Sequence, residues 1–157
     1  MPKKKSWREK VNEVEEKIHV ITPEWEERLG KGQILIPCPK DIERIICQVQ
    51  EGELVTNDII REILAQEKKV LLTAAIPTGV YLKYVALVAE EEKETKEKIT
   101  PYWRVIKPDG SVNIKFPGGA EHQINLLERE GHIIVPGKGK KAPKVLNYKH
   151  SLMQYLK

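Results

Sequence analysis

The two cysteines are the side chains best suited to nucleophilic or metal chemistry. Cys38 lies in the run Ile36-Pro37-Cys38-Pro39, and Cys47 falls among the apolar positions of a predicted amphipathic helix. Neither cysteine has metal-ligand spacing around it, so the sequence excludes a cysteine-based zinc site and a disulfide scaffold. We expect no cofactor, no metal and a reducing, cytoplasmic location. Cys38 is predicted to pack or cap, and Cys47 to be a buried, inert thiol.

Basic side chains gather at both ends of the chain, although the net charge is only +4. Residues 1–10 hold five basic side chains and one acidic one, and residues 132–157 hold six lysines and no carboxylate. The segment between them, 11–131, is therefore acidic. Basic ends are suited to contact phosphate, but terminal lysines also keep a protein soluble. Charge alone leaves both interpretations open.

The size and composition of the chain predict one folded domain. Its 157 residues are 40% hydrophobic and 32% charged, which provides enough apolar material for a core and excludes wholesale disorder. The longest mostly apolar run, Val80–Ala89, is interrupted by Lys83 and is far shorter than the ~20 residues that span a bilayer. No apolar segment typical of a secretory signal follows the basic start. We therefore expect a monomer that does not enter a membrane.

Apolar spacing and capping residues predict several helices in the first 92 residues. Ser6 and Glu9 form a capping box for a helix over 7–18, and a short helix begins at Thr22-Pro23 and ends at Gly30. Further helices are expected from Pro39 to Gly52, after the N-cap Thr56 and over 79–92, with extended segments over 33–37 and 69–73. The helix over 79–92 is nearly apolar on all sides, so we expect it at the centre of the fold.

The second half of the chain predicts short strands and one more helix. A strand over Tyr102–Ile106 leads to the turn Pro108-Asp109-Gly110 and a return strand over Val112–Ile114. A helix over about 120–130 follows, and then a basic hairpin of Ile133–Val135 with Lys144–Tyr148. Three helices followed by a hairpin form the outline of a winged helix-turn-helix in a mainly helical α+β protein. A generic α+β domain is the alternative at this level.

Several short motifs in a fixed order make this prediction more specific. They are Gly52-Glu53-Leu54-Val55-Thr56, Pro101-Tyr102-Trp103-Arg104-Val105-Ile106, Asp109-Gly110-Ser111, Gly118-Gly119 and Leu126-Leu127-Glu128-Arg129-Glu130-Gly131. Together they resemble the DNA-binding domain of O6-alkylguanine-DNA alkyltransferases (methylated-DNA–protein-cysteine methyltransferases). The resemblance implies a winged-helix alkyltransferase-like domain over residues 38–131. Residues 1–37 would be an N-terminal helical extension, and residues 132–157 a basic hairpin or tail packed on the same domain.

The reactive positions of that family are replaced in this sequence. In the family a cysteine thiolate accepts the alkyl group, assisted by a histidine and a glutamate, and the matching residues here are Tyr102, Trp103 and Ile124. A phenol with a pKa of about 10 is mostly protonated at neutral pH and accepts an alkyl group poorly. The resemblance therefore implies that methyltransferase activity is absent. Alkyl transfer to Cys38 or Cys47 is a third, weaker hypothesis.

The alkyltransferase-like branch of the family binds alkylated guanine without repairing it and marks it for other repair proteins. This sequence resembles that branch, with tyrosine where the branch has tryptophan. The resemblance implies a pocket for a flipped base lined by Pro101, Tyr102, Trp103 and Phe116, because aromatic rings stabilise a flipped base by stacking. The alternative is that the two rings of Tyr102 and Trp103 only fill the space that the lost catalytic groups have left.

The family also places a helix in the minor groove, where an arginine replaces the flipped base. The matching residue here is Lys83 in one alignment and Tyr81 in another, and Lys lacks the planar fork of Arg. Bulkier side chains, Tyr84 and Leu87, stand where the family has small residues. The candidate DNA-binding residues are Thr56, Asn57, Tyr81, Lys83, Arg104, Lys107, Ser111 and Lys115, with Arg104 in a structural or a phosphate-binding role.

Two functions of different classes follow from the sequence. The first is a non-catalytic protein that binds double-stranded DNA, including DNA with O6-alkylguanine, and signals to a repair-protein partner. It would use the helix over 79–92, the turn Lys107–Ser111 as a wing and the basic ends on phosphate. The second is a catalytically retired winged-helix scaffold for protein contacts, favoured by the acidic middle of the chain.

Overall fold

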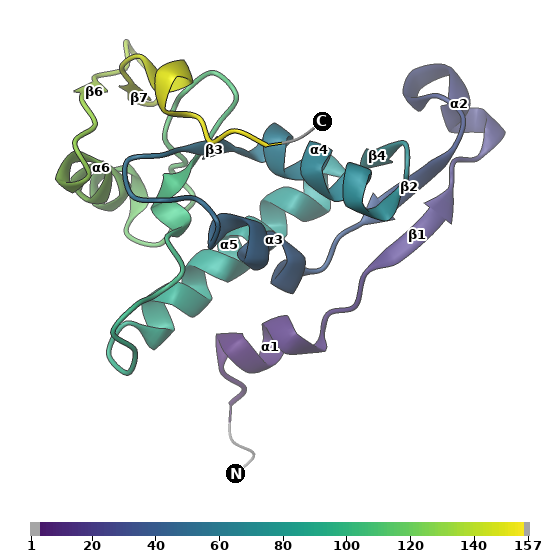
Figure 1. Ribbon diagram of the computed structural model, residues 1–157, viewed down its shortest axis with the longest axis horizontal. Helices are drawn as coiled ribbons and strands as arrows, with labels where there is room; N and C mark the ends of the chain where they lie inside the picture. Colours follow the sequence, from purple (N-terminus) through teal and green to yellow (C-terminus); the bar gives the residue numbers. More distant parts are fainter. Residues whose placement is uncertain (1–3, 156–157) are drawn as a thin grey trace.

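A computed structural model describes residues 4–155 and shows helices packed around a central one (Figure 1). Helix α5 (Ala75–Glu92) lies between α3 (Pro39–Ile46) and α4 (Asn57–Lys68). The prediction of a central apolar helix is confirmed, and α5 begins four residues earlier than expected because Pro77 is tolerated in a first turn. Within residues 4–155 no helix is both long and apolar enough to cross a membrane.

The N-terminal extension alternates helix and strand. Helix α1 (Trp7–Glu13) has the predicted Ser6–Glu9 capping box. The predicted continuation of this helix to residue 18 is wrong, because Ile18 lies in strand β1 (Lys17–Val20). Its β-branched side chains favour a strand, and β1 pairs antiparallel with β2 (Gln33–Ile36). Helix α2 (Pro23–Leu29) joins the two strands and ends at Gly30, as predicted.

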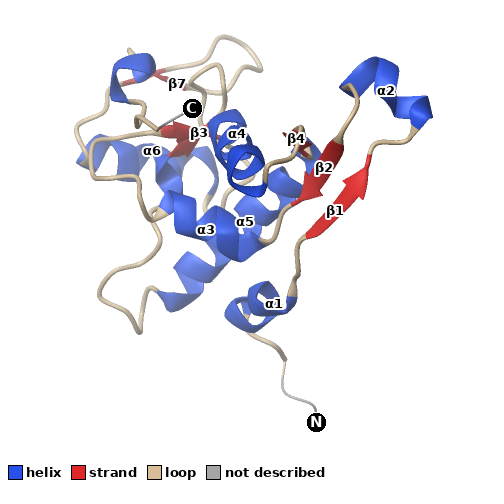
Figure 2. Ribbon diagram, turned by 45° about the vertical axis from the view of Figure 1, so that its right-hand side comes forward, coloured by secondary structure: helices blue, strands red, loops and turns tan. Residues whose placement is uncertain are grey.

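Strand pairing ties this extension to the helical core. Strand β4 (Leu72–Thr73), between α4 and α5, pairs in parallel with β2, so the sheet order is β1-β2-β4. Figure 2 shows β1 and β2 leading out from the helices to α2 at their far end. Leu35 of β2 is buried in the main core cluster with residues of α3, α4 and α5. The extension therefore contributes to the core that positions α5.

The segment after α5 forms less sheet than the sequence predicted. A single 3-10 turn covers Tyr102–Arg104, and strand β5 (Val105–Ile106) follows it. Strand β5 pairs in parallel with β3 (Val55–Thr56), at the entry to α4. The predicted return strand over 112–114 does not form, because Ser111 instead makes an isolated bridge with Lys144. The turn Lys107–Ser111 is thus held by the C-terminal segment.

A second, smaller core cluster lies under the C-terminal segment. Helix α6 (Gly119–Arg129) precedes the predicted basic hairpin, which forms from β6 (Ile134–Val135) and a shorter β7 (Lys144–Val145). Val145 is buried there, together with Leu54, Ile106, Val112 and Leu127. A 3-10 turn, Tyr148–Ser151, leads the chain back over the domain. Lys3 and Lys157, two of the basic end residues, lie outside the described range.

Candidate nucleic-acid interface

Tyr102, which the motifs align with the family's acceptor cysteine, lies inside the domain. Its side chain is 1% exposed. The ring centroid lies 5.5 Å from that of Trp103 and 5.3 Å from that of Phe116, both at interplanar angles of 80°. Edge-to-face packing of this kind is favourable. In the structure the Tyr102 ring occupies the space between Trp103 and Phe116, and the base pocket stays a prediction.

The surroundings of the Tyr102 hydroxyl make it a poor nucleophile. Its oxygen is buried and makes no hydrogen bond to the described residues. Burial, and then the nearby Glu90 carboxylate, raise the pKa of Tyr102 well above its ordinary value. His122 Nε2 lies 3.2 Å from Glu90 Oε1. Glu90 and His122 could not be predicted from the sequence, because neither belongs to a motif and only the packing of α5 and α6 brings them together.

The cavity beside this segment does not lead to Tyr102. It has a volume of about 910 Å3, and its lining includes Pro101, Trp103 and Arg104 but not Tyr102. Four carboxylates and four basic side chains line it. Some of these charges pair directly: Arg8 lies 2.7 Å from Glu43. Because the opposite charges are balanced, this cavity offers phosphate no concentrated positive field.

Arg104 stabilises the domain. Its Nε and Nη2 donate to the Glu130 carboxylate at 2.9 and 2.7 Å, and its Nη1 donates to the Val49 carbonyl oxygen at 2.6 Å. The side chains of Arg104 and Glu130 are only 14% and 8% exposed. A guanidinium paired in this way is not available to a phosphate. These contacts give Arg104 the structural role that the sequence allowed, and its contact with DNA stays a prediction.

One of the two cysteines lies in surroundings other than those predicted. Cys38 is half-buried at the N-cap position of α3, and burial raises the pKa of its thiol. Cys47 is exposed, so the prediction of a buried thiol is wrong. Helix α3 ends at Ile46, and Cys47 turns outward at its C-cap, with Sγ 3.8 Å from Thr100 Oγ1. Cys47 also lines the cavity that contains Trp103.

The exposed face of α5 carries Lys83. Lys83 is exposed, whereas Tyr81 is half-buried and packs against Tyr84 with ring centroids 5.5 Å apart. The Tyr84 ring also packs against the Trp7 ring of α1, with ring centroids 5.2 Å apart. The bulk of Tyr84 is therefore accommodated by the N-terminal extension. Around Lys83 the exposed residues are apolar: Ile76 is 82% exposed and Val80 is 44% exposed.

The remaining predicted contacts divide into surface and interior positions. Lys107 and Lys115 are exposed, and Asn57 is half-buried. Thr56 and Ser111 are 3% and 5% exposed, and Ser111 Oγ donates to Asp109 Oδ1 at 2.6 Å. These two side chains are buried in the structure, and their contact with DNA stays a prediction. Among residues 4–155 no group of His, Cys, Asp or Glu side chains is arranged to hold a metal ion.

Comparison with known structures tests the fold directly. The crystal structure of S. pombe Atl1 in complex with damaged DNA containing O6-carboxymethylguanine aligns with 74% of this chain and 94% of that chain, at 18% identity and a TM-score of 0.50. A crystal structure of S. pombe ATL with DNA covers the same shares at 19% identity and a TM-score of 0.48. No protein-family model and no curated protein sequence matches the chain. The chain therefore has the mainly helical α+β fold of Atl1, which confirms the alkyltransferase-like fold that its motifs indicated.

Proposed function

We propose that this protein binds double-stranded DNA without catalysing a reaction on it. The observation that carries the proposal is the fold shared with Atl1, a protein crystallised on damaged DNA. The helix that the family inserts into the minor groove corresponds to α5, whose exposed face carries Lys83. Lys107 and Lys115 are exposed in the segments that follow and add positive charge for phosphate contacts.

The apolar residues beside Lys83 suit the minor groove. Proteins that bind this groove insert apolar side chains between base steps and place basic side chains on nearby phosphates. Ile76 and Val80 provide the first kind of group on α5, and Lys83 provides the second. Lys83 is also better placed than Tyr81 for the position of the family's arginine, because Tyr81 packs against Tyr84.

A titration of duplex DNA against salt tests this proposal. Each phosphate that the protein neutralises contributes about −0.9 to the slope of log affinity against log salt, so Lys83→Gln should reduce the magnitude of that slope by about 1. Lys40→Gln, which changes an exposed lysine on α3, is the matched control and should leave the slope unchanged. Failure of the wild-type protein to bind duplex DNA at low salt would refute the proposal.

The finer part of the proposal concerns the lesion. We propose that the bound DNA carries an alkylated guanine, and that the complex marks it for a repair protein. Entry of a flipped base between Tyr102 and Phe116 requires the Tyr102 ring to move, because that ring is buried. Stacking on the rings of this segment then offsets part of the cost of base flipping. Equal affinity for duplexes with guanine and with O6-methylguanine would refute lesion recognition, but it would not contradict DNA binding.

The absence of alkyl transfer is tested separately. The raised pKa of Tyr102 favours its neutral phenol. We therefore expect intact-mass spectrometry to show no added alkyl group after the protein is incubated with O6-methylguanine DNA. The exposed Cys47 makes this measurement necessary. A methyl gain that disappears in Cys47→Ser would show a reaction at that sulfur and contradict the non-catalytic assignment.

A scaffold for protein contacts is the second candidate function. The exposed apolar residues Ile76 and Val80 on α5 favour it, because such patches also mark protein interfaces. A partner that remains bound after nuclease digestion, and is lost in Ile76→Asp, would support the scaffold. Loss of duplex binding in the same variant, with no nuclease-resistant partner, would support the DNA-binding function.

A further inference from the structure

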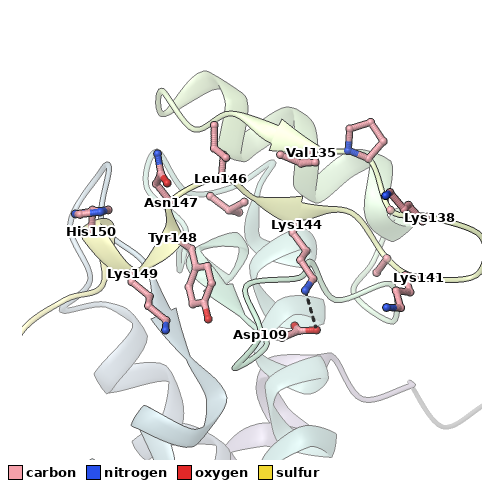
Figure 3. A pocket seen from close by; sticks show the side chains of 14 residues that line it. Asp109, Val135, Lys138, Lys141, Lys144, Leu146, Asn147, Tyr148, Lys149 and His150 are labelled. Atoms are coloured by element: carbon pink, nitrogen blue, oxygen red, sulfur yellow. Dashed lines mark ion pairs between the residues drawn. The ribbon is translucent and has the colours of Figure 1, made fainter.

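A basic cavity lies in the C-terminal segment, away from α5 and Tyr102. Strands β6 and β7, the loop between them and the following 3-10 turn enclose about 550 Å3. Figure 3 shows Lys138, Lys141 and Lys144 on one side of this cavity and Lys149 and His150 on the other. The sequence motifs that resemble alkyltransferases lie within residues 38–131 and include none of these side chains.

The charge of this cavity is almost entirely positive. Asp109 is the single carboxylate in its lining, and it lies 3.8 Å from Lys144. Across the described part of the chain, no carboxylate lies within 4.0 Å of Lys138, Lys141 or Lys149. Like charges around a concave surface reinforce one another and concentrate anions. A group with negative charge is therefore the expected ligand.

The interior of the cavity is apolar. Val135 and Leu146 are 42% and 47% exposed, and both contribute to the lining together with the ring of Tyr148. Figure 3 shows Leu146 and Tyr148 between the two groups of basic side chains. A simple inorganic anion gains nothing from such a surface. A ligand that combines an anionic group with a flat ring satisfies both parts of the lining.

Backbone packing fixes the two sides of the cavity before a ligand arrives. In the loop, a Cβ atom at Gly137 would overlap the carbonyl oxygen of Lys141, and Lys141 N–H donates to the Lys138 carbonyl oxygen at 3.1 Å. On the other side, Tyr148 Oη donates to the Pro108 carbonyl oxygen at 2.9 Å. A site built from such tightly packed backbone loses little entropy on binding.

We propose that this cavity binds a nucleotide, either free or within a single strand of nucleic acid. The phosphate lies against Lys138, Lys141 and Lys149, and the base lies on Val135 and Leu146. Single-strand sites combine basic side chains, which bind phosphate, with aromatic rings, on which bases stack, and the aromatic ring in this lining is that of Tyr148. This inference goes beyond the proposed function, because it uses other residues and another ligand than duplex binding by α5.

Fluorescence anisotropy of a labelled oligothymidylate with the full-length protein tests the inference. The triple variant Lys138→Gln/Lys141→Gln/Lys149→Gln should weaken binding and reduce the magnitude of the salt slope by about 2, at about −0.7 per phosphate on a single strand. The control variant Lys17→Gln/Lys31→Gln/Lys40→Gln changes three exposed lysines that do not line this cavity. It should bind as the wild type does.

Two further ligands separate nucleotide binding from general attraction to charge. Thymidine monophosphate should displace the strand if the cavity binds free nucleotides, and should fail to displace it if binding needs a strand. Amide chemical shifts should move within residues 135–150 in either case. Equal loss in both triple variants, or equally tight binding of polyglutamate, would overturn the inference. Duplex binding that depends on Lys83 is measured independently, so either proposal can fail alone.

Discussion

At the scale of residues, single buried groups determine much of the stability of the segment around Tyr102. Tyr102 packs its aromatic ring in the core, and its hydroxyl is buried without a hydrogen bond to the described residues. A buried polar atom in this condition costs about 1–3 kcal/mol. Packing of the ring stabilises the fold, whereas the unpaired hydroxyl destabilises it.

Tyr102→Phe separates these two parts. Because the variant keeps the ring and removes the unpaired hydroxyl, we expect its free energy of unfolding to be about 1 kcal/mol higher than that of the wild type. The raised pKa of Tyr102 also predicts that the wild type loses stability as the pH rises above about 10, where the unfolded phenol ionises. Urea denaturation at pH 7 and pH 11 measures both effects.

Tyr102→Ala removes the ring as well as the hydroxyl. This variant should lower the free energy of unfolding by about 3–5 kcal/mol.

The Arg104–Glu130 ion pair predicts that the protein loses stability as the pH falls. Burial is the largest single influence on the pKa of Glu130 and raises it, but the hydrogen bonds that the carboxylate accepts and the positive charge of Arg104 together outweigh burial, so the net pKa lies below the usual range. A carboxyl with a lowered folded pKa stabilises the fold above its unfolded pKa of about 4.3, and this stability is lost as the pH falls further. Glu130→Gln should therefore be less stable than the wild type at pH 7 and should converge with it toward pH 3. A constant difference across that range would contradict the linkage.

At the scale of elements, the turn Lys107–Ser111 depends on the C-terminal segment rather than on a strand partner of its own. Val145 N–H donates to the Gly110 carbonyl oxygen at 2.9 Å, and the Tyr148 ring covers Gly110. The predicted return strand fails for this reason: its place beside the turn is taken by β7. The turn signal in the sequence was correct, but the partner comes from more than 30 residues later.

Gly110→Ala and Gly52→Ala form a matched pair that tests this packing. Both glycines have a positive φ, +89° and +88°, so both variants bear the cost of the left-handed region, about 1–2 kcal/mol. A Cβ at Gly52 meets no atom within 4 Å, whereas a Cβ at Gly110 would overlap the Tyr148 ring. Thermal denaturation should show the larger loss for Gly110→Ala. Equal losses would mean that Tyr148 does not pack on the turn.

How much the sequence predicted depends on the range of the interactions. The helices α3, α4, α5 and α6 follow from local apolar spacing and caps, and their existence was correctly predicted. Strand β1 was missed because its pairing with β2 spans the whole of α2. The same limit applies to the site, where Tyr102 was found by motif but the Glu90–His122 pair depends on how α5 and α6 meet.

At the scale of the whole molecule, Trp103 connects the two core clusters. Its half-buried ring packs against the larger cluster around α5 and against the smaller one under the C-terminal segment. The chain end reinforces this connection, because Leu54 N–H donates to the Ser151 carbonyl oxygen and Met153 N–H donates to the Leu54 carbonyl oxygen, both at 2.8 Å. The C-terminal segment therefore joins the same folding unit as the helices.

This connection predicts a single cooperative unfolding transition. Far-UV circular dichroism, which reports mainly on the helices, and the near-UV signal of the aromatic rings should change with the same midpoint, as two-state unfolding requires. Trp103→Ala should lower stability by about 3–5 kcal/mol and should separate the two signals, because each cluster then loses its contact with the other. Leu82→Ala, a change confined to the larger cluster, should lower the midpoint while keeping the signals coincident. Separate midpoints in the wild-type protein would show that the C-terminal segment unfolds independently of the helical core.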